Sequence, residues 1–164
     1  MRIKQLKWIC AVLAALGVGT NIDAHAQDTT EFRVGAADTD ITPPQGIPMW
    51  GYGARHDAPA IGALDPLMAK AIVIAAGARK VALVGIDLGR GPTEAMMKTI
   101  RREIAAKAGI EHVLITGSHT HHGPVIELID EPGLGQGKFD TAVAYSQKLP
   151  VLLVEAILAA DRDS

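Results

Sequence analysis

Residues 80–116 read KVALVGIDLGRGPTEAMMKTIRREIAAKAGIEHVLIT, and this stretch decides the fold class of the chain. Residues 80–88 and 112–116 are short apolar runs rich in β-branched side chains, which is typical of strands buried on both faces. Residues 92–108 between them repeat apolar side chains at helical spacing, and Gly109 follows as a stop signal. The stretch therefore predicts a strand, a helix and a second strand that runs parallel to the first through a right-handed connection.

Further strands and a second helix are expected on either side of this unit. Residues 69–76 (AKAIVIAA) read as a buried strand that a tight turn at residues 77–79 joins to the next strand. Residues 31–37 (EFRVGAA) read as a first strand, and residues 138–161 read as a helix in which Pro150 predicts a kink or a break. We therefore expect an α/β fold, with a mixed or parallel sheet and flanking helices. We expect this fold to be incomplete as given, that is, a truncated domain, because no further strands follow in the sequence to cover the sheet.

The amino terminus carries the features of a secretory signal peptide. A basic start precedes an apolar run at residues 8–18, and the AHA sequence at residues 24–26 fits a cleavage site. The alternative is a membrane anchor, but no long apolar segment or basic flank follows. We therefore expect residues 1–26 to be removed and residues 27–164 to be exported, to a periplasm or out of the cell. The sole cysteine, Cys10, lies in the leader, so no thiolate is expected in the mature part.

The composition narrows the function classes. The chain has 164 residues, 48% hydrophobic and 21% charged, which is typical of one globular domain. The formal net charge is −2, and the basic residues are scattered without interleaved aromatic side chains. Neither a phosphate-neutralising stripe nor a base-stacking surface is expected from this distribution. Nucleic acid is therefore not an expected partner.

A cluster of histidines follows the second strand of the strand-helix-strand unit. Residues 116–124 read TGSHTHHGP, and in an extended segment His119 and His121 project to one side while His122 points away. Two imidazoles without a thiolate favour zinc, and residues 123–124 would turn the chain sharply away to leave a coordination position open. The alternative is a set of ordinary loop histidines, because a bare HxH pattern is common.

The position of the cluster favours a metal or catalytic site. In open α/β sheets, ligands bind beyond the carboxyl ends of the strands, which here are residues 87–89 and 117–119. Asp87 lies at one of these ends. Its carboxylate could orient a metal-bound imidazole, or it could simply serve the turn.

Two other regions hold polar side chains whose roles stay open. The loop at residues 49–59 (MWGYGARHDAP) reads as a binding loop, and its Arg55 and His56 either face the crevice or lie in solvent. His112 begins a strand instead of ending one, so we expect an ordinary surface histidine there.

The order of the segments resembles the amino-terminal part of the neutral/alkaline non-lysosomal ceramidase family. Five blocks carry the resemblance, which spans residues 32–160. In order they are FRVGAADTDITPP (32–44), MWGYG (49–53), DPLMAKAIVI (65–74), VALVGIDLG (81–89) and VLITGSHTHHGP (113–124). The last block resembles the HTHSGP signature of the family and is the most specific of the five.

The resemblance implies a zinc hydrolase that cleaves the amide of ceramide (N-acylsphingosine) to sphingosine and a fatty acid, with His119 as a zinc ligand. For His121 it implies a role as a second ligand or as a stabiliser of the transition state. Asp87 stays beside them as a candidate catalytic residue on the orientation argument given above. Zinc would polarise the amide carbonyl or activate a water molecule. The expected substrate is then a lipid amide. The protein is expected to contact a membrane surface only through that substrate.

The chain departs from the family pattern at three points. His122 stands where the motif has serine, and Leu64 stands where relatives commonly carry a histidine. The other zinc ligands of the family, a histidine, a glutamate and a tyrosine, and its nucleophilic serine lie downstream of Ser164. We therefore expect this chain alone to be incomplete and inactive.

Rival functions come from two classes. Among enzymes, amidohydrolases usually place HxH near the amino end, and metallo-β-lactamases need an aspartate shortly after the second histidine, where this chain has Gly123 and Pro124. A metallohydrolase acting on another amide stays open. The rival outside enzymes is a non-catalytic exported protein that binds a metal or a lipid.

Overall fold

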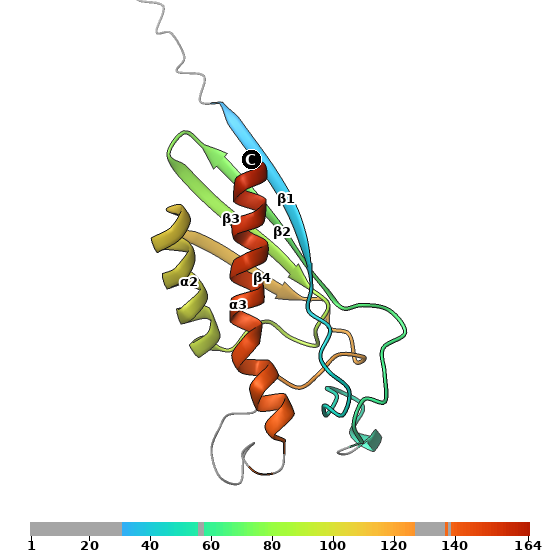
Figure 1. The fold of residues 1–164 in the computed structure, drawn as a ribbon. Coiled ribbons are helices and arrows are strands. Elements are labelled where there is room, and N and C mark those ends of the chain that lie inside the picture. Colours follow the sequence, from blue (N-terminus) through green and yellow to red (C-terminus); the bar gives the residue numbers. More distant parts are fainter. Residues whose placement is uncertain (1–30, 56–57, 127–136, 138) are drawn as a thin grey trace, which may run out of the picture.

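The computed structural model describes residues 31–55, 58–126, 137 and 139–164. Within these residues the strands form one sheet in the order β1-β2-β3-β4 (Figure 1). Their bounds are Phe32–Asp40 for β1, Met68–Ala76 for β2, Arg79–Ile86 for β3 and His112–Gly117 for β4. The expected signal peptide at residues 1–26 and the loop residue His56 lie outside the described residues and stay predictions.

The strand directions give a mixed sheet. β1 pairs with β2 and β2 pairs with β3 in antiparallel register, the second pair through a tight turn at Gly77, whose φ is 59°. β3 pairs with β4 in parallel register, from Val81 opposite His112 to Ile86 opposite Gly117. The α/β fold class and the parallel strand-helix-strand unit are therefore confirmed.

The helix between β3 and β4 is α2, Glu94–Ala108. The Thr93 side chain caps its first turn by accepting a hydrogen bond from the Met96 backbone N–H at 3.4 Å. Gly109 ends it in the left-handed conformation, with φ 65°. The Gly109 signal was predicted from the sequence, and the helix lies within residues 92–108 as expected.

The second helix, α3, spans Asp140–Asp163 and runs through Pro150 without a break. Among the described helices it alone is long and apolar enough to cross a membrane by length and composition. Leu149, Leu153 and Ile157 are nevertheless fully buried inside the fold. The apolar side of α3 is therefore core surface, which explains its composition without a bilayer.

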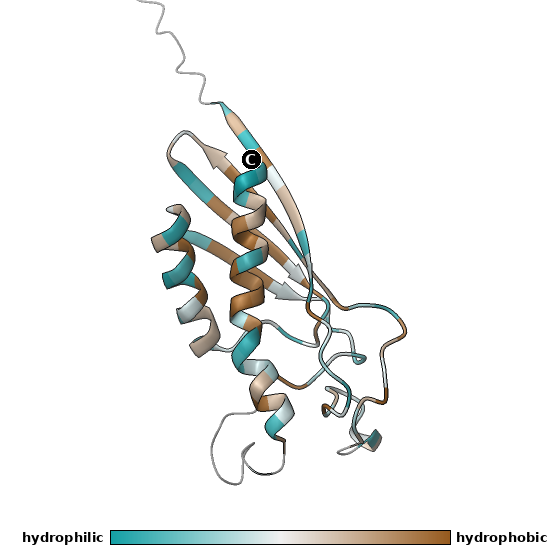
Figure 2. Cartoon of the chain, viewed as in Figure 1, coloured by the Kyte–Doolittle hydropathy of each residue, from teal (hydrophilic) through white to brown (hydrophobic). Residues whose placement is uncertain are grey.

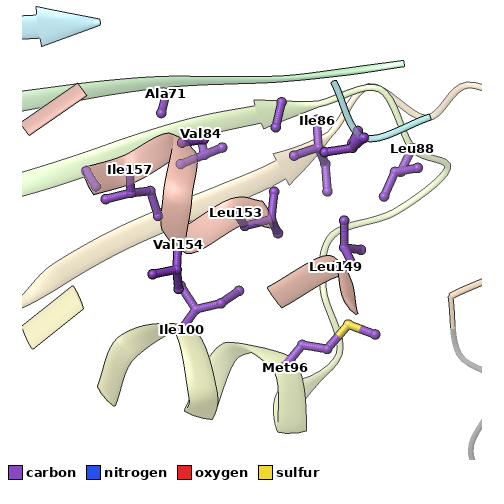
Figure 3. Close-up of a cluster of buried hydrophobic side chains, with 14 of the residues drawn as sticks. Ala71, Val84, Ile86, Leu88, Met96, Ile100, Leu149, Leu153, Val154 and Ile157 are labelled. Atoms are coloured by element: carbon purple, nitrogen blue, oxygen red, sulfur yellow. The ribbon is translucent and has the colours of Figure 1, made fainter. Parts of the chain in front are cut away.

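Both helices lie over the same face of the sheet (Figure 1), α3 against β1 and β2 and α2 beside α3. Hydrophobic residues recur along the strands and along both helices (Figure 2), and the buried ones form one cluster. Figure 3 shows the resulting core, in which Val84 and Ile86 of β3 lie on the side of Leu153 of α3, and Ile100 of α2 lies beside Val154 of α3. Each fully buried Leu or Ile side chain stabilises such a core by about 1.5–3 kcal/mol.

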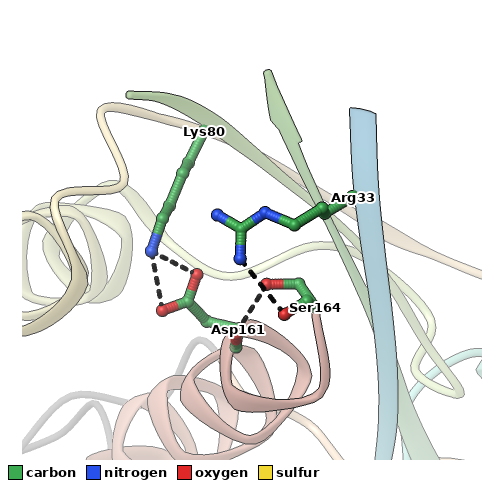
Figure 4. A network of polar contacts seen from close by, with 4 residues as sticks. All are labelled: Arg33, Lys80, Asp161 and Ser164. Atoms are coloured by element: carbon green, nitrogen blue, oxygen red, sulfur yellow. Dashed lines mark hydrogen bonds and ion pairs between the residues drawn. The ribbon is translucent and has the colours of Figure 1, made fainter. Parts of the chain in front are cut away.

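Polar contacts fix the carboxyl end of α3 to the sheet (Figure 4). Lys80 of β3 lies 2.7 Å from Oδ1 of Asp161, and its ammonium group donates to Oδ2 at 2.9 Å. Arg33 of β1 donates to the Ser164 carbonyl at 3.4 Å. Gly35 allows the close approach, since a Cβ there would lie 2.1 Å from the carbonyl oxygen of Ala160.

Tyr145 of α3 ties the helix to the loop that leads toward the histidines. Its hydroxyl donates to the carbonyl of Ile41, directly after β1. Burial raises the pKa of Tyr145 far above its ordinary value, and the nearby charge of Asp40 adds to the effect. The phenol therefore stays neutral and hydrogen-bonded in the folded chain.

The prediction that the strands are buried on both faces is wrong for the described residues. On the face away from α2 and α3, Ile72 is 42% exposed, Leu83 is 40% exposed and Leu114 is 63% exposed. We call this side of the sheet the helix-free face, because no described helix covers it. An apolar run looks the same in sequence whether the second face is covered or not.

Candidate functional site

The histidines lie where the parallel strands end. Past the last residues of β3 and β4 the two chain segments stay hydrogen-bonded, since the Ser118 N–H donates to the Ile86 carbonyl at 2.9 Å. The His119 N–H likewise donates to the carbonyl of Leu88 at 3.1 Å. The histidine cluster therefore lies beyond the carboxyl ends of β3 and β4, where the strand order predicts the ligand crevice.

A backbone carbonyl fixes the ring of His119. Its Nδ1 atom lies 3.0 Å from the carbonyl oxygen of Gly89, in the segment after β3. A carbonyl only accepts hydrogen bonds, so in the neutral ring Nδ1 carries the proton and Nε2 keeps its lone pair. Metal-binding histidines are held in this way in proteins, with one nitrogen on a carbonyl or carboxylate and the other on the metal.

The rings of His119 and His121 lie side by side, with centroids 5.3 Å apart and planes at 68°. Two imidazoles that bind one tetrahedral zinc ion at about 2.0–2.1 Å have ring centroids about 5 Å apart. The separation of the two rings therefore agrees with that of two ligands on one zinc ion. No group of three or more histidine, cysteine, aspartate or glutamate side chains able to hold a metal occurs among the residues that the structure describes.

An extended segment, as expected from the sequence, is not what brings the rings of His119 and His121 together. His119 has a φ of 63°, so it lies in the left-handed region and not in an extended segment. This conformation costs a non-glycine residue of order 1–2 kcal/mol. A turn at His119, and not the alternation of a strand, brings the pair to one side. His122 is exposed, and its ring lies 5.8 Å from that of Tyr52.

The chain bends at residues 121–123, directly after the pair of histidines. Pro124 then forms an antiparallel bridge with Met49. The Trp50 N–H donates to the Gly123 carbonyl at 2.9 Å, and the Val125 N–H donates to the Pro48 carbonyl at 3.0 Å. This pairing attaches the loop at residues 49–55 directly to the histidine segment.

Two aromatic side chains of that loop contact the histidine rings, and the sequence analysis had left the role of the loop open. The Trp50 ring lies edge-on to His119 at 5.0 Å and to His121 at 4.8 Å between centroids. The Tyr52 ring lies 4.8 Å from His121. Arg55 faces the crevice, because its Nη1 donates to the His121 carbonyl at 3.0 Å. The signal in the sequence was two aromatic residues within a glycine-rich loop.

Asp87 has a structural contact in this arrangement. Its Oδ2 accepts a hydrogen bond from the Met68 N–H at 3.1 Å, while its own N–H donates to the Met68 carbonyl at 2.9 Å. These bonds join the end of β3 to the start of β2. The ring of His119 has the Gly89 carbonyl as its partner instead, and a part for Asp87 in catalysis stays a prediction.

A hollow of about 820 Å³ lies beside the histidine segment. Asp87, Thr120 and His122 contribute to its wall, together with apolar residues of the loop between β1 and β2. Leu64, where a histidine was expected from the resemblance, lines this hollow and is fully exposed. His112 lies exposed at the start of β4, away from the cluster, as a surface histidine would.

No protein-family model and no curated protein sequence matches the chain. Among solved structures, the neutral ceramidase from Pseudomonas aeruginosa is similar, with a TM-score of 0.64 and 23% identity over 83% of this chain. A ceramidase complexed with C2 is similar as well, with a TM-score of 0.63 and 23% identity over 80% of this chain. The chain spans only 22% and 21% of the lengths of those two proteins. This likeness shows that the described residues adopt the fold of one part of the ceramidases.

Proposed function

We propose that the chain is the amino-terminal part of an exported, ceramidase-type zinc amidase that cleaves ceramide or another N-acyl lipid. The observation that carries the proposal is the pair of adjacent imidazoles of His119 and His121 at the carboxyl edge of β3 and β4. Adjacent imidazoles on a loop have many uses, but here they stand in a fold that two ceramidase structures share.

Each residue of the site has a distinct task in this proposal. His119 presents Nε2 to the metal, because its Nδ1 is engaged by the Gly89 carbonyl. His121 is either a second ligand or a donor to the oxygen that gains charge in the transition state. A zinc ion held there would supply Lewis-acid polarisation of the amide carbonyl. The hollow beside His122 offers apolar surface next to the histidines for part of a lipid.

The helix-free face supports the proposal that the active protein contains more polypeptide than these residues. Parallel strand pairs are normally covered on both faces, yet Leu83 of β3 and Leu114 of β4 are 40% and 63% exposed. An exposed apolar sheet face of this kind marks a contact surface. Further ligands and the remaining catalytic groups would then come from the polypeptide that covers it, and this chain alone is expected to turn over no ceramide.

The test uses the protein in its producing cell. The substitutions His119→Ala and His112→Ala are introduced separately into the chromosomal copy, and release of fatty acid from a fluorogenic ceramide is measured in the exported fraction. We expect His119→Ala to abolish the release that depends on this protein, and the surface control His112→Ala to retain it. Equal activity in the two strains would refute the proposal.

A non-catalytic metal-binding protein is the second candidate, and one observation favours it. The described residues supply two imidazoles but no third ligand, and two protein ligands hold zinc weakly. The candidates differ in the mass of the native protein. A mass well above that of residues 27–164 is expected for the amidase, while a mass equal to that of residues 27–164 would favour the metal-binding protein.

A further inference from the structure

The two histidine rings are held by different means. The ring of His119 has a hydrogen bond from Nδ1 to the Gly89 carbonyl. The ring of His121 has no hydrogen bond to another described residue and is held by ring contacts. The second torsion of a histidine side chain is broad and roughly two-fold, so a loop imidazole without such restraints samples many orientations. What fixes His121 is therefore the packing around it.

Trp50 contacts both rings at once. Its centroid lies 5.0 Å from that of His119 at an interplanar angle of 70°, and 4.8 Å from that of His121 at 82°. Tyr52 contacts His121 from the same loop, at 4.8 Å and 77°. Edge-to-face pairs at these separations each contribute about 0.5–1.5 kcal/mol beyond the burial of area.

Glycine backbone leaves the rings of His121 and Trp50 little room to move. Gly51 has a φ of 78°, and a Cβ at this residue would lie 2.5 Å from Cγ of His121. A Cβ at Gly89 would lie 2.2 Å from Cε3 of Trp50. Glycine backbone thus closes directly against the ring of His121 and against the ring of Trp50.

The loop itself is attached firmly enough to serve as a support. The Trp50 N–H is bonded to Gly123, and Arg55 donates to the His121 carbonyl while its guanidinium lies 5.1 Å from the centroid of the Tyr52 ring. Tyr52 has a φ of 43°, an unusual conformation for a residue with a side chain. A left-handed non-glycine residue is retained when the surrounding contacts determine it.

We propose that Trp50 is a positioning residue that helps to hold both histidine rings, in addition to the hydrogen bond that fixes His119, and that Tyr52 helps to hold His121 alone. The inference rests on the proposed zinc site, because the orientation of the rings is what a metal ion would require of them. It assigns the tryptophan and tyrosine of the MWGYG loop a common task, namely the support of the imidazoles.

The first measurement follows the ring protons of His119 and His121 by NMR in the full chain without metal. We expect Trp50→Leu to move the ring signals of both histidines toward those of free histidine, and Trp50→Phe to restore most of the shift. Tyr52→Leu should move His121 and leave His119 in place. Phe32→Leu, which removes an exposed aromatic ring on β1, is the matched control and should move neither.

The second measurement is the affinity of the same variants for Zn²⁺. Residues that orient metal ligands typically change metal affinity by about 10–100-fold, so we expect a loss in that range for Trp50→Leu and near-normal affinity for Trp50→Phe.

Unchanged ring signals in Trp50→Leu, with sheet amide signals intact, would overturn the inference. So would moved ring signals with unchanged zinc affinity. Absence of zinc binding in the native, unsubstituted protein would refute the proposed zinc site instead, and the metal-free ring signals would still decide whether Trp50 positions the rings.

Discussion

The Nδ1 atom of His119 lies 3.0 Å from the carbonyl oxygen of Gly89, so the ring that follows β4 is anchored to the segment that follows β3. The two strands are parallel neighbours, and their carboxyl ends lie at the same edge of the sheet. The fold therefore provides both the imidazole and the acceptor that orients it. The Gly89 backbone carbonyl is that acceptor. The absence of a Cβ at Gly89 also leaves space for the ring of Trp50.

The first prediction concerns the tautomer of His119. Because its Nδ1 donates to a carbonyl, neutral His119 should carry its proton on Nδ1 and leave Nε2 unprotonated. Nitrogen-15 NMR of the imidazole distinguishes the two forms directly. A neutral ring protonated at Nε2 would mean that the hydrogen bond to Gly89 does not form in solution.

The second prediction concerns the fit of Gly51 against His121. Alanine there would adopt an unfavourable φ of 78° and place its methyl group 2.5 Å from the ring, so Gly51→Ala should lower the free energy of unfolding by more than about 1 kcal/mol. It should also weaken Zn²⁺ binding. Gly53→Ala is the control, because a Cβ at Gly53 meets nothing within 4 Å. Equal effects in urea unfolding of the two variants would contradict the packing described for His121.

The sequence predicts those features that depend on local chemistry. Gly109 marks the end of α2, and short apolar runs mark β2, β3 and β4. The site position also follows from sequence, since parallel strands deliver the residues after Ile86 and after Gly117 to one edge. These features need no knowledge of distant contacts.

The features that sequence did not predict depend on contacts between distant segments. The pairing of Met49 with Pro124 joins residues far apart in the chain, and no periodic pattern in the sequence predicts this pairing. The contact of Trp50 with two histidines follows from that pairing. The exposed side chains of the helix-free face were also missed, because burial depends on which elements lie opposite.

The third prediction uses the buried phenol of Tyr145. Its pKa is raised in the folded chain above the ordinary value of 10.0, so the unfolded chain releases this proton first as the pH rises. The free energy of unfolding should therefore be unaffected by this group below about pH 10 and fall as the pH rises beyond it. Tyr145→Phe should lose part of this alkaline dependence in denaturant titrations at several pH values. An identical pH profile in both proteins would contradict the buried, neutral phenol.

The fourth prediction separates the two roles considered for Asp87. Asp87→Ala removes the acceptor of the Met68 N–H and should lower the free energy of unfolding by about 1–3 kcal/mol, while Asp87→Asn keeps an acceptor oxygen and should cost less. Neither change should alter the ring signals of His119, whose partner is Gly89. Altered His119 signals in the stable Asp87→Asn variant would instead favour a carboxylate that orients the metal site.

The most direct test of the zinc site is calorimetric titration of the full chain with Zn²⁺, comparing the unsubstituted protein with His119→Ala and His112→Ala. We predict one Zn²⁺ per chain, a loss of affinity of about 10-fold or more in His119→Ala, and unchanged affinity in the surface control His112→Ala. Equal affinity of His119→Ala and the unsubstituted chain would contradict the assignment of His119 as a zinc ligand.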